Sequence, residues 1–445
     1  MRGAVAAGHP VTAEAGAQVL ARGGNAVDAC IGAAFAAAVT EGPLTGPAGG
    51  GFLLVHTVEG ETTLLDCFFA VPATRLGVME EVVVDFGDAS TQTFHVGEGS
   101  VAVPGLVHGL EAAHRRFGTL AWRQLVEPAI AIARAGVVRN DAQALLHEML
   151  GAILQRTEAG GRIYGDPDRV VTSELAATLE RIRDEGSAAI AELIPELAPD
   201  LAAYRPVERP PLEAEIRGRR ILATPPPSRG GAVVLDILRM LAAPDYGGPI
   251  HDLARAVGLA YERSAPGSVT GTTHISVVDA DGAAAALSST LGSGSGVFRG
   301  GTQLNNMLGE LDVIGPEERP AGERLPSMMT PTMVLENGRP RLLLGSAGSV
   351  RLAGAIAQVT WQALCGAGLE EAIEAPRVHV EGTTLHVEGG WADDAVACLP
   401  RSWDVVRWAG RNLYFGGVQA VALAPDGSLS AAGDPRRGGA GVIVA

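Results

Sequence analysis

The alternation of apolar and polar residues predicts helices near the start of the chain, followed by a pair of strands. Residues Thr12 to Arg22 repeat their apolar positions with helical spacing. The Ala-rich run from Ala26 to Ala38 has side chains small enough to pack tightly against a sheet. The largely apolar run from Phe52 to Val58 and the segment from Thr62 to Leu65 flank a turn at Glu59-Gly60. This spacing indicates a β-hairpin.

Strand patterns dominate after residue 270. Residues Thr332 to Glu336 and Pro340 to Leu344 flank Asn337-Gly338, and Asn-Gly is the strongest short hairpin motif. A helix is expected from Val350 to Leu364, and another strand from Val418 to Leu423. Helices early in the chain and antiparallel hairpins late in it favour a layered arrangement of helices and sheets.

Composition narrows the class of protein. The chain has 445 residues, a formal net charge of -16 and 47% hydrophobic residues, and all of its basic side chains are arginine. A large core is therefore possible, and nucleic acid or an anionic membrane is not expected as a partner. We find neither a secretory signal pattern nor a long apolar run, so we expect a cytoplasmic protein. The cysteines Cys30, Cys67, Cys365 and Cys398 are widely spaced, which favours small buried side chains over disulfides.

The segment from Gly271 to Asp279 carries the candidate chemistry. If the peptide bond between Gly271 and Thr272 breaks, Thr272 presents a nucleophilic hydroxyl and a free α-amine, whose pKa is ordinarily near ~8. One residue then supplies both the attacking group and its base. A Thr-Thr pair also occurs at strand starts for packing alone, so the local pattern leaves both interpretations open.

Hairpin geometry places a second threonine near Thr272. Residues 274–279 and 283–289 flank a tight turn, Ala280-Asp281-Gly282. Two registers are possible, with Thr272 opposite either Ser289 or Leu291. Both registers bring Thr290 beside the backbone of Thr272. The alternative for Thr290 is an ordinary Ser/Thr run on a solvent-facing strand.

Nine motifs in one order resemble those of the γ-glutamyltranspeptidase family, from near residue 6 to near residue 441. They are Gly23-Gly24-Asn25-Ala26-Val27-Asp28-Ala29, Gly49-Gly50-Gly51-Phe52-Leu53-Leu54-Val55, Val101-Ala102-Val103-Pro104-Gly105, Pro225-Pro226-Pro227-Ser228 with Gly230-Gly231, the Thr272 segment, Leu304-Asn305-Asn306, Gly345-Ser346-Ala347-Gly348, Phe415-Gly416-Gly417-Val418-Gln419 and Asp434-Pro435-Arg436-Arg437-Gly438.

The resemblance implies an α+β fold, a four-layer αββα sandwich of the N-terminal-nucleophile (Ntn) hydrolase type, formed by residues 1–445 as one domain. It also implies self-cleavage into a large segment, 1–271, and a small segment, 272–445, which stay associated. Thr290 would support the nucleophile, and the backbone N–H groups of Gly348 and Ser349 would form an oxyanion hole. Ser349 stands where a second Gly is usual, and an ordinary strand-to-helix turn is the alternative for this segment. The resemblance implies no metal and no organic cofactor.

The positions that resemble the family's amino-acid-binding site have changed. Phe68 stands where the family has an Arg that binds the substrate carboxylate, and Met307 stands where Gln is common. Glu310 replaces an Asp that binds the substrate amine. Ser327 matches one of two adjacent serines whose second is Met328 here, and Gly292 replaces an Asn. We expect weaker binding of free γ-glutamyl groups, because an apolar side chain cannot replace a charge-assisted clamp. Arg299 and Arg351 are candidates to restore a carboxylate contact.

These residues and motifs are compatible with three functions. The first is a self-processing threonine amidohydrolase or acyltransferase that cleaves a γ-glutamyl or related amide through an acyl-Thr272 intermediate, passing the acyl group to water or to an amine acceptor. The second is an acylase or small-amide amidohydrolase that does not act on γ-glutamyl groups. The third is an unprocessed scaffold or binding protein. The sequence does not determine the acyl group, the acceptor or the oligomeric state.

A repeated His-Val-Glu pattern, at His379-Val380-Glu381 and His386-Val387-Glu388, could also suggest metal ligands. Alternation along a strand favours polar groups on one solvated face instead of a zinc site.

Overall fold

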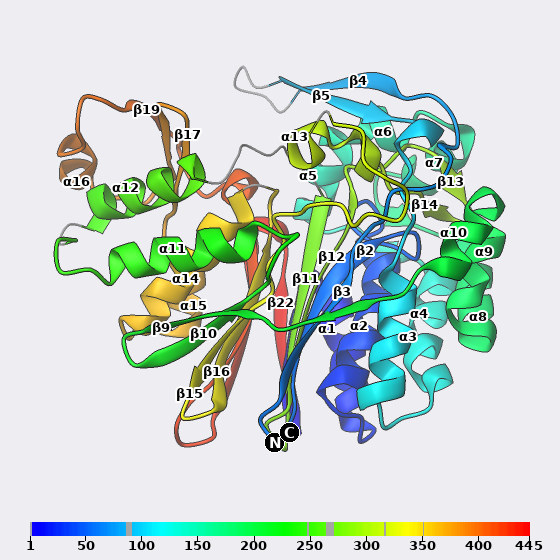
Figure 1. The fold of residues 1–445 in the computed structure, drawn as a ribbon, viewed down its shortest axis with the longest axis horizontal. Coiled ribbons are helices and arrows are strands. Elements are labelled where there is room, and N and C mark those ends of the chain that lie inside the picture. Colours follow the sequence, from blue (N-terminus) through cyan, green and yellow to red (C-terminus); the bar gives the residue numbers. More distant parts are fainter. Residues whose placement is uncertain (1, 86–90, 247–248, 264–270, 316, 350) are drawn as a thin grey trace.

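The computed structural model describes residues 2–85, 91–246, 249–263, 271–315, 317–349 and 351–445. Two large sheets lie face to face, and helices cover the outer face of each (Figure 1). The first sheet contains, in spatial order, β22 (Ala440–Val444), β1 (Gly3–Ala7), β11 (Gly271–Asp279), β12 (Ala284–Gly292), β2 (Gly50–His56), β3 (Thr62–Cys67) and β8 (Val207–Arg209). The second contains β21 (Leu429–Gly433), β20 (Gly417–Leu423), β16 (Arg339–Ala347), β15 (Thr332–Glu336), β10 (Arg219–Ala223) and β9 (Leu212–Ile216). The predicted four-layer αββα sandwich is therefore confirmed.

Two helix layers enclose the sheets (Figure 1). The first sheet is covered by α1 (Pro10–Ala21), α2 (Ala26–Thr40) and α3 (Leu106–Phe117). Outside these pack α4 (Trp122–Ala135), α8 (Ser173–Glu185), α9 (Ala189–Leu193) and α10 (Ala198–Ala203). The second is covered by α11 (Gly230–Leu241), α12 (Pro249–Glu262), α14 (Arg351–Leu364) and α15 (Leu369–Glu374). The expected helix start at Val350 lies outside the described residues.

Short elements join these layers or lie at their edges. The short helices are α5 (Asp141–Met149), α6 (Gly151–Leu154), α7 (Glu158–Tyr164), α13 (Leu311–Ile314), α16 (Asp393–Ala397), η1 (Glu98–Ser100), η2 (Gly186–Ala188), η3 (Pro195–Leu197), η4 (Met307–Gly309), η5 (Leu413–Phe415) and η6 (Pro435–Arg437). The small sheets pair β4 (Glu80–Asp85) with β5 (Thr91–Val96), β6 (Val137–Val138) with β7 (Arg169–Val170), β13 (Phe298–Arg299) with β14 (Thr302–Gln303), and β17 (Val378–Glu381) with β18 (Thr384–Val387) and β19 (Asp404–Arg407).

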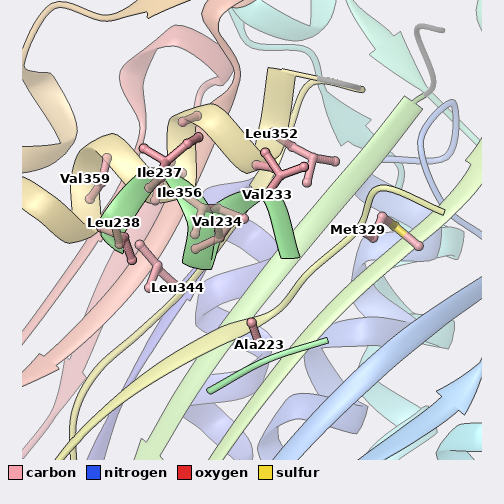
Figure 2. Close-up of a cluster of buried hydrophobic side chains, with 14 of the residues drawn as sticks. Ala223, Val233, Val234, Ile237, Leu238, Met329, Leu344, Leu352, Ile356 and Val359 are labelled. Carbon is pink, nitrogen blue, oxygen red and sulfur yellow. The ribbon is translucent and has the colours of Figure 1, made fainter. Parts of the chain in front are cut away.

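Side-chain alternation along the strands builds two separate cores. On β2, Phe52 and Leu54 belong to the core that includes the second sheet, whereas Leu53 and Val55 belong to the core under α1 and α2. Both faces of the first sheet are thus buried, which explains why β2 is an apolar run with no polar alternation. Figure 2 shows the outer part of the first core, where Val233 and other side chains of α11 meet Leu352, Ile356 and Val359 of α14 above Leu344 of β16.

Strand directions place the candidate residues at one end of the molecule. Gly3 pairs with Asp279, so β11 ends beside the N-terminus and begins at the opposite end (Figure 1). The turn after β11 and the turn before β16 lie together, because Asp281 and Gly338 line the same cavity. The start of β11 and the end of β16 therefore lie at the same end of the sandwich. We call it the nucleophile end, defined by residues 271–273, 290–293 and 347–349.

Candidate active site

The hairpin of β11 and β12 brings Thr272 and Thr290 together, but neither register expected from the sequence is correct. Thr273 pairs with Ser289, and a β-bulge then shifts the register so that Gly271 pairs with Gly292. The two expected registers both assumed a two-residue turn. The register differs because the turn is a three-residue loop in which Gly282 has φ +87°, and Asp279 N–H donates to the Ala283 carbonyl over 3.0 Å.

Thr290 contacts the peptide bond that was predicted to break. Its Oγ1 donates a hydrogen bond to the Gly271 carbonyl, and it accepts one from Gly292 N–H at 2.8 Å. The predicted position of Thr290 beside the nucleophile is thus confirmed, while its supporting role in catalysis stays a prediction. A hydroxyl bound to a carbonyl oxygen can stabilise negative charge that develops on that oxygen.

Thr272 is fully buried and its hydroxyl is not used structurally. Its Oγ1 has no hydrogen-bond partner in the part of the chain that the structure describes. Alternation along β11 directs the Thr272 side chain toward the second sheet, as for His274, whose ring lies 2.2 Å from the position a Cβ on Gly345 would occupy. His274 Nδ1 and Nε2 bond Ser288 Oγ at 2.8 Å and Ser276 Oγ at 2.9 Å. Burial lowers the pKa of His274 to about 3, so this ring is a neutral core group.

Gly348 and Ser349 lie at the same end of the sandwich as Thr272. Gly345 of β16 faces His274 of β11. Ala347 comes two residues after Gly345 and Thr272 comes two residues before His274, so these two residues lie at the same level of the sandwich. Gly348 has φ +121° and Ser349 has φ +65°, a left-handed conformation that is uncommon outside glycine. The chain turns sharply here, directly after the last residue of β16. Their oxyanion role stays a prediction.

Glu310, the position predicted to bind the substrate amine, lies in a hydrogen-bonded network at the nucleophile end. Glu310 Oε1 accepts from Ser293 N–H at 3.0 Å and from Ser293 Oγ at 2.9 Å. Asn306 Nδ2 donates to Ser293 Oγ at 2.6 Å. A Cβ on Gly292 would lie 2.1 Å from Asn306 Oδ1, so only glycine fits where the loop crosses this network. The network holds the Glu310 carboxylate against the loop that follows Thr290.

The other substrate-binding candidates lie in the core between the sheets. Phe68 is 1% exposed and stacks on Phe52 with ring centroids 5.2 Å apart, and Met307 and Met328 belong to the same buried cluster. Ser327 Oγ accepts a hydrogen bond from Met329 N–H at 3.0 Å. Apolar contacts thus occur where the family resemblance implies polar ones.

Arg299 and Arg351 are both engaged elsewhere. Arg299 binds Glu98 and Glu196 on the surface, and Arg351 Nε donates to the Tyr414 carbonyl at 2.6 Å. Neither forms the free carboxylate site suggested from the sequence.

Arg437 was not among the residues predicted from the sequence. It forms no ion pair within the described residues, and its Nη2 lies 3.7 Å from the position of a Cβ on Gly348.

Arg437 carries an available positive charge near the predicted oxyanion turn. Its Nη2 donates to the Leu413 carbonyl at 3.0 Å, and its Nε has no partner in the described part of the chain. Burial lowers the pKa of Arg437 to about 10, which still leaves it charged at neutral pH. Its presence in the Asp434-to-Gly438 motif was the available sequence clue.

Glu41 and Thr273 are two further residues at this end of the sandwich that were not predicted from the sequence. Glu41 caps the C-terminus of α2, and Thr273 Oγ1 donates a hydrogen bond to Glu41 Oε2. An acidic residue directly after an Ala-rich apolar helix was the one sequence feature that could have indicated Glu41. Only the fold shows that it contacts the residue next to Thr272.

The expectation for the His-Val-Glu repeat is partly wrong. His379 is buried against Tyr261, and Glu388 is buried in an ion pair with Arg436, so these groups do not share a solvated face. Among the residues that the structure describes, no three His, Cys, Asp or Glu side chains are grouped as metal ligands would be.

Cys30, Cys67, Cys365 and Cys398 are all free, but Cys365 and Cys398 are exposed, contrary to expectation. Within the described segments, no helix has the length and apolar character needed to cross a membrane.

The αββα sandwich, with a threonine at the start of a central strand, defines an Ntn hydrolase. The family model described as Gamma-glutamyltranspeptidase matches residues 12–266 and 260–444. The chain therefore belongs to the γ-glutamyltranspeptidase family, whose members are hydrolases and transferases.

Similar proteins include enzymes of two kinds. The glutathione hydrolase proenzyme of Escherichia coli (strain K12) is 30% identical over 537 residues, which cover 98% of this chain and 90% of the relative. The acylase ACY 1 proenzyme of Pseudomonas sp. (strain SE83) is 30% identical over 538 residues, which cover 100% of this chain and 94% of the relative. The crystal structure of cephalosporin acylase from Bacillus halodurans superposes with a TM-score of 0.85 at 22% identity, over 99% of this chain and 95% of that one. This last likeness supports the fold.

Proposed function

We propose that the protein is a self-processing threonine amidohydrolase. The observation that carries this proposal is the contact of Thr290 with the Gly271 carbonyl, next to a buried Thr272 hydroxyl that no described residue bonds. Thr272 Oγ attacks the Gly271 carbonyl carbon, the C–N bond breaks, and the nitrogen gains the proton that the hydroxyl lost. Water then hydrolyses the resulting ester, which releases the Gly271 carboxylate and regenerates the Thr272 hydroxyl beside the α-amine that the first step had freed.

The same threonine then acts on substrate. Its α-amine accepts the proton of the hydroxyl, the hydroxyl oxygen attacks an amide carbonyl, and the amine product leaves with that proton. The acyl-Thr272 ester passes its acyl group to water. Thr290 and the Gly348-Ser349 turn would stabilise the oxyanion in each step. The two segments remain one molecule, and the substrate is a small amide.

For the acyl group, we propose a γ-glutamyl or related group whose carboxylate reaches Arg437. This side chain is a cation without an ion-pair partner among the described residues, near the predicted oxyanion turn. Glu310 would attract an amine on the same substrate. The proposal replaces the family's carboxylate-binding arginine by one from a different part of the chain.

A second candidate is an acylase that takes a less polar acyl group. The buried, apolar side chains of Phe68, Met307 and Met328 favour it, because they cannot form the charge-assisted clamp expected at these positions. One substrate panel separates the two candidates. A γ-glutamyl anilide hydrolysed faster than simple acyl anilides, with Arg437→Met losing that preference, would support the first. Equal or faster hydrolysis of the simple anilides would support the second.

The decisive test of self-processing uses Thr272→Ala. Wild-type protein should separate on a denaturing gel into segments of 271 and 174 residues, since 445 minus 271 is 174, whereas Thr272→Ala should remain one chain and lose turnover. N-terminal sequencing of the smaller segment should begin at Thr272. The control is Thr272→Ser, which keeps a hydroxyl and should still cleave. An active enzyme that stays uncut would overturn the proposal.

A further inference from the structure

Glu41 is a buried carboxyl at the C-terminal end of α2. It is 6% exposed and forms no ion pair among the described residues. Its Oε2 accepts from Thr273 Oγ1 and its Oε1 accepts from Thr12 Oγ1 at 3.1 Å. A Cβ on Gly8 would lie 2.2 Å from Oε2, so the carboxyl is closely packed. Two threonine hydroxyls are thus the only hydrogen-bond donors that the described structure gives to this group.

This arrangement is unfavourable for a charged side chain. Burial raises the pKa of Glu41 to about 7, and its place at the C-terminus of α2 adds the repulsion of the helix dipole. Stability alone does not explain a glutamate here, because a neutral side chain would avoid the cost of burying charge. A role at the neighbouring strand does explain it.

Other titratable groups on the elements around Glu41 do not change charge in the same pH range. These are His9 at the start of α1, His147 on α5, and Arg436 and Arg437 near the C-terminus. Burial lowers the pKa of both His9 and His147 to about 4, so both rings are neutral above pH 5. Both arginines remain charged through neutral pH.

The segment that begins with Glu41 is bound to both strand ends that carry the nucleophile. Thr45 Oγ1 and Ser289 Oγ are 2.8 Å apart, and Leu291 N–H donates to the Leu44 carbonyl at 2.9 Å. Thr273 points to the helix side of β11, as Ile275 does, whereas Thr272 points between the sheets. Glu41 therefore acts from behind the strand and does not reach the space in front of the Thr272 hydroxyl.

We propose that Glu41 is a positioning residue for Thr272: its carboxylate holds the Thr273 hydroxyl and thereby fixes the backbone of the preceding residue for attack. This inference rests on the proposed self-processing function and names a residue that controls it. An ionised carboxylate can accept from both threonines at once. A protonated carboxyl must place its own hydrogen at one of them, so the hold on Thr273 weakens.

Self-cleavage of the full chain is the best measurement, because it needs no knowledge of the substrate. The Thr272 amine is free once the C–N bond breaks and can also titrate during ester hydrolysis, so the Glu41→Gln variant decides which group gives the inflection. Full-length protein from cell-free translation would be shifted to a series of pH values from 5.5 to 9, and the remaining uncut chain measured by mass spectrometry. For wild type, we expect the rate to rise through about pH 7 and then level off, as Glu41 ionises.

Two variants each remove one partner of the hydrogen bond between Thr273 and Glu41. Glu41→Gln should slow cleavage at pH 8 by at least about 10-fold, which corresponds to ~1.4 kcal/mol of barrier, and should abolish the inflection. Thr273→Val removes the same hydrogen bond without altering the carboxyl, so it tests the inference even if Glu41→Gln fails to fold. The double variant should be no slower than the slower single variant, because both remove one interaction. Thr62→Val is the matched control, since its hydroxyl bonds His56 at 2.8 Å at the far end of the same sheet.

The outcomes are distinguishable. Cleavage by both single variants at the wild-type rate, with the inflection retained, would overturn the role of Glu41 and leave self-processing intact. A loss of rate matched by Thr62→Val, together with a lower melting temperature, would show a purely structural effect and also overturn it. A wild-type chain that never cleaves would refute the proposed function itself.

Discussion

At the scale of single residues, the chemistry depends on hydroxyls whose surroundings differ sharply. The Thr272 hydroxyl has no hydrogen-bond partner among the described residues, whereas the hydroxyls of Thr273 and Thr290 are both engaged, one with a carboxyl and one with the carbonyl of the predicted scissile bond. The residue types of this segment were readable from the sequence. Which threonine is free and which are anchored depends on the two faces of β11 and on the bulge.

Thr290→Ala should slow both self-cleavage and turnover by about 10- to 1,000-fold. It removes a donor to the Gly271 carbonyl and leaves Gly292 N–H without its acceptor, at a cost of roughly 1–3 kcal/mol. Thr290→Ser keeps both hydrogen bonds and should retain most of the rate. Rates from timed denaturing gels check this, and equal rates for Ala and Ser would count against the oxyanion contact.

Ionisation of Glu41 should lower the stability of the fold. The pKa of Glu41 is raised to about 7 in the folded chain, from a value near 4.5 in the unfolded chain. The protonated side chain therefore contributes its full stabilisation of the fold below pH 4.5, and this stabilisation is lost as pH rises through about 7. In a Thr272→Ala background, which keeps the chain uncut, Glu41→Gln should increase the free energy of unfolding more at pH 8.5 than at pH 4. The two increases should differ by about 3 kcal/mol. Urea unfolding at the two pH values measures this. If the free energies of unfolding of the two variants differ by the same amount at both pH values, the expected ionisation of the buried Glu41 carboxyl is contradicted.

At the scale of elements, the two central strands β11 and β16 must approach closely. Gly345 lies directly over the His274 ring, and both turns at the far end of these strands lie together. The Asn337-Gly338 hairpin was correctly predicted from the sequence. The β11–β12 register was not, because a three-residue loop and a bulge each shift the pairing by one residue.

Gly345→Ala should destabilise the protein by roughly 1–3 kcal/mol. Its new methyl group would lie 2.2 Å from His274 Nδ1, and the ring cannot move without straining its bonds to Ser288 and Ser276. Gly161→Ala in α7 is the control, because no neighbour lies within 4 Å and alanine favours the helix. Urea unfolding of both variants in the uncut Thr272→Ala background checks the difference, and a stable Gly345→Ala would contradict the close contact.

At the scale of the whole molecule, the two predicted segments are interleaved. In the first sheet β1 of the large segment lies between β22 and β11 of the small one, and in the second sheet β10 pairs with β15. A buried ion-pair network adds contacts among elements of the small segment, with Arg377 bound to Asp434 and Arg436 bound to Glu388. Cleavage at Gly271 therefore changes the covalent chain without removing any strand from its sheet.

The cleaved segments should elute together in native size-exclusion chromatography and separate only after denaturation. The physical reason is that separating them would expose strand edges on both sheets and both cores. Uncut Thr272→Ala protein provides the reference elution volume. Elution of wild type as two native species would contradict the interleaved arrangement.

Helical spacing, Asn-Gly turns and ordered motifs are local properties of the chain, so the sequence alone was enough to predict the main helices and hairpins, the family and the candidate nucleophile Thr272. The register around Thr272, the burial of Phe68 and Met307, and the approach of Glu41 and Arg437 became visible only in the folded molecule. Some of these contacts join residues far apart in the chain, such as Glu41 with Thr273, which are 232 positions apart. They follow from how sheets and helices pack, and packing is not encoded in any short stretch of residues.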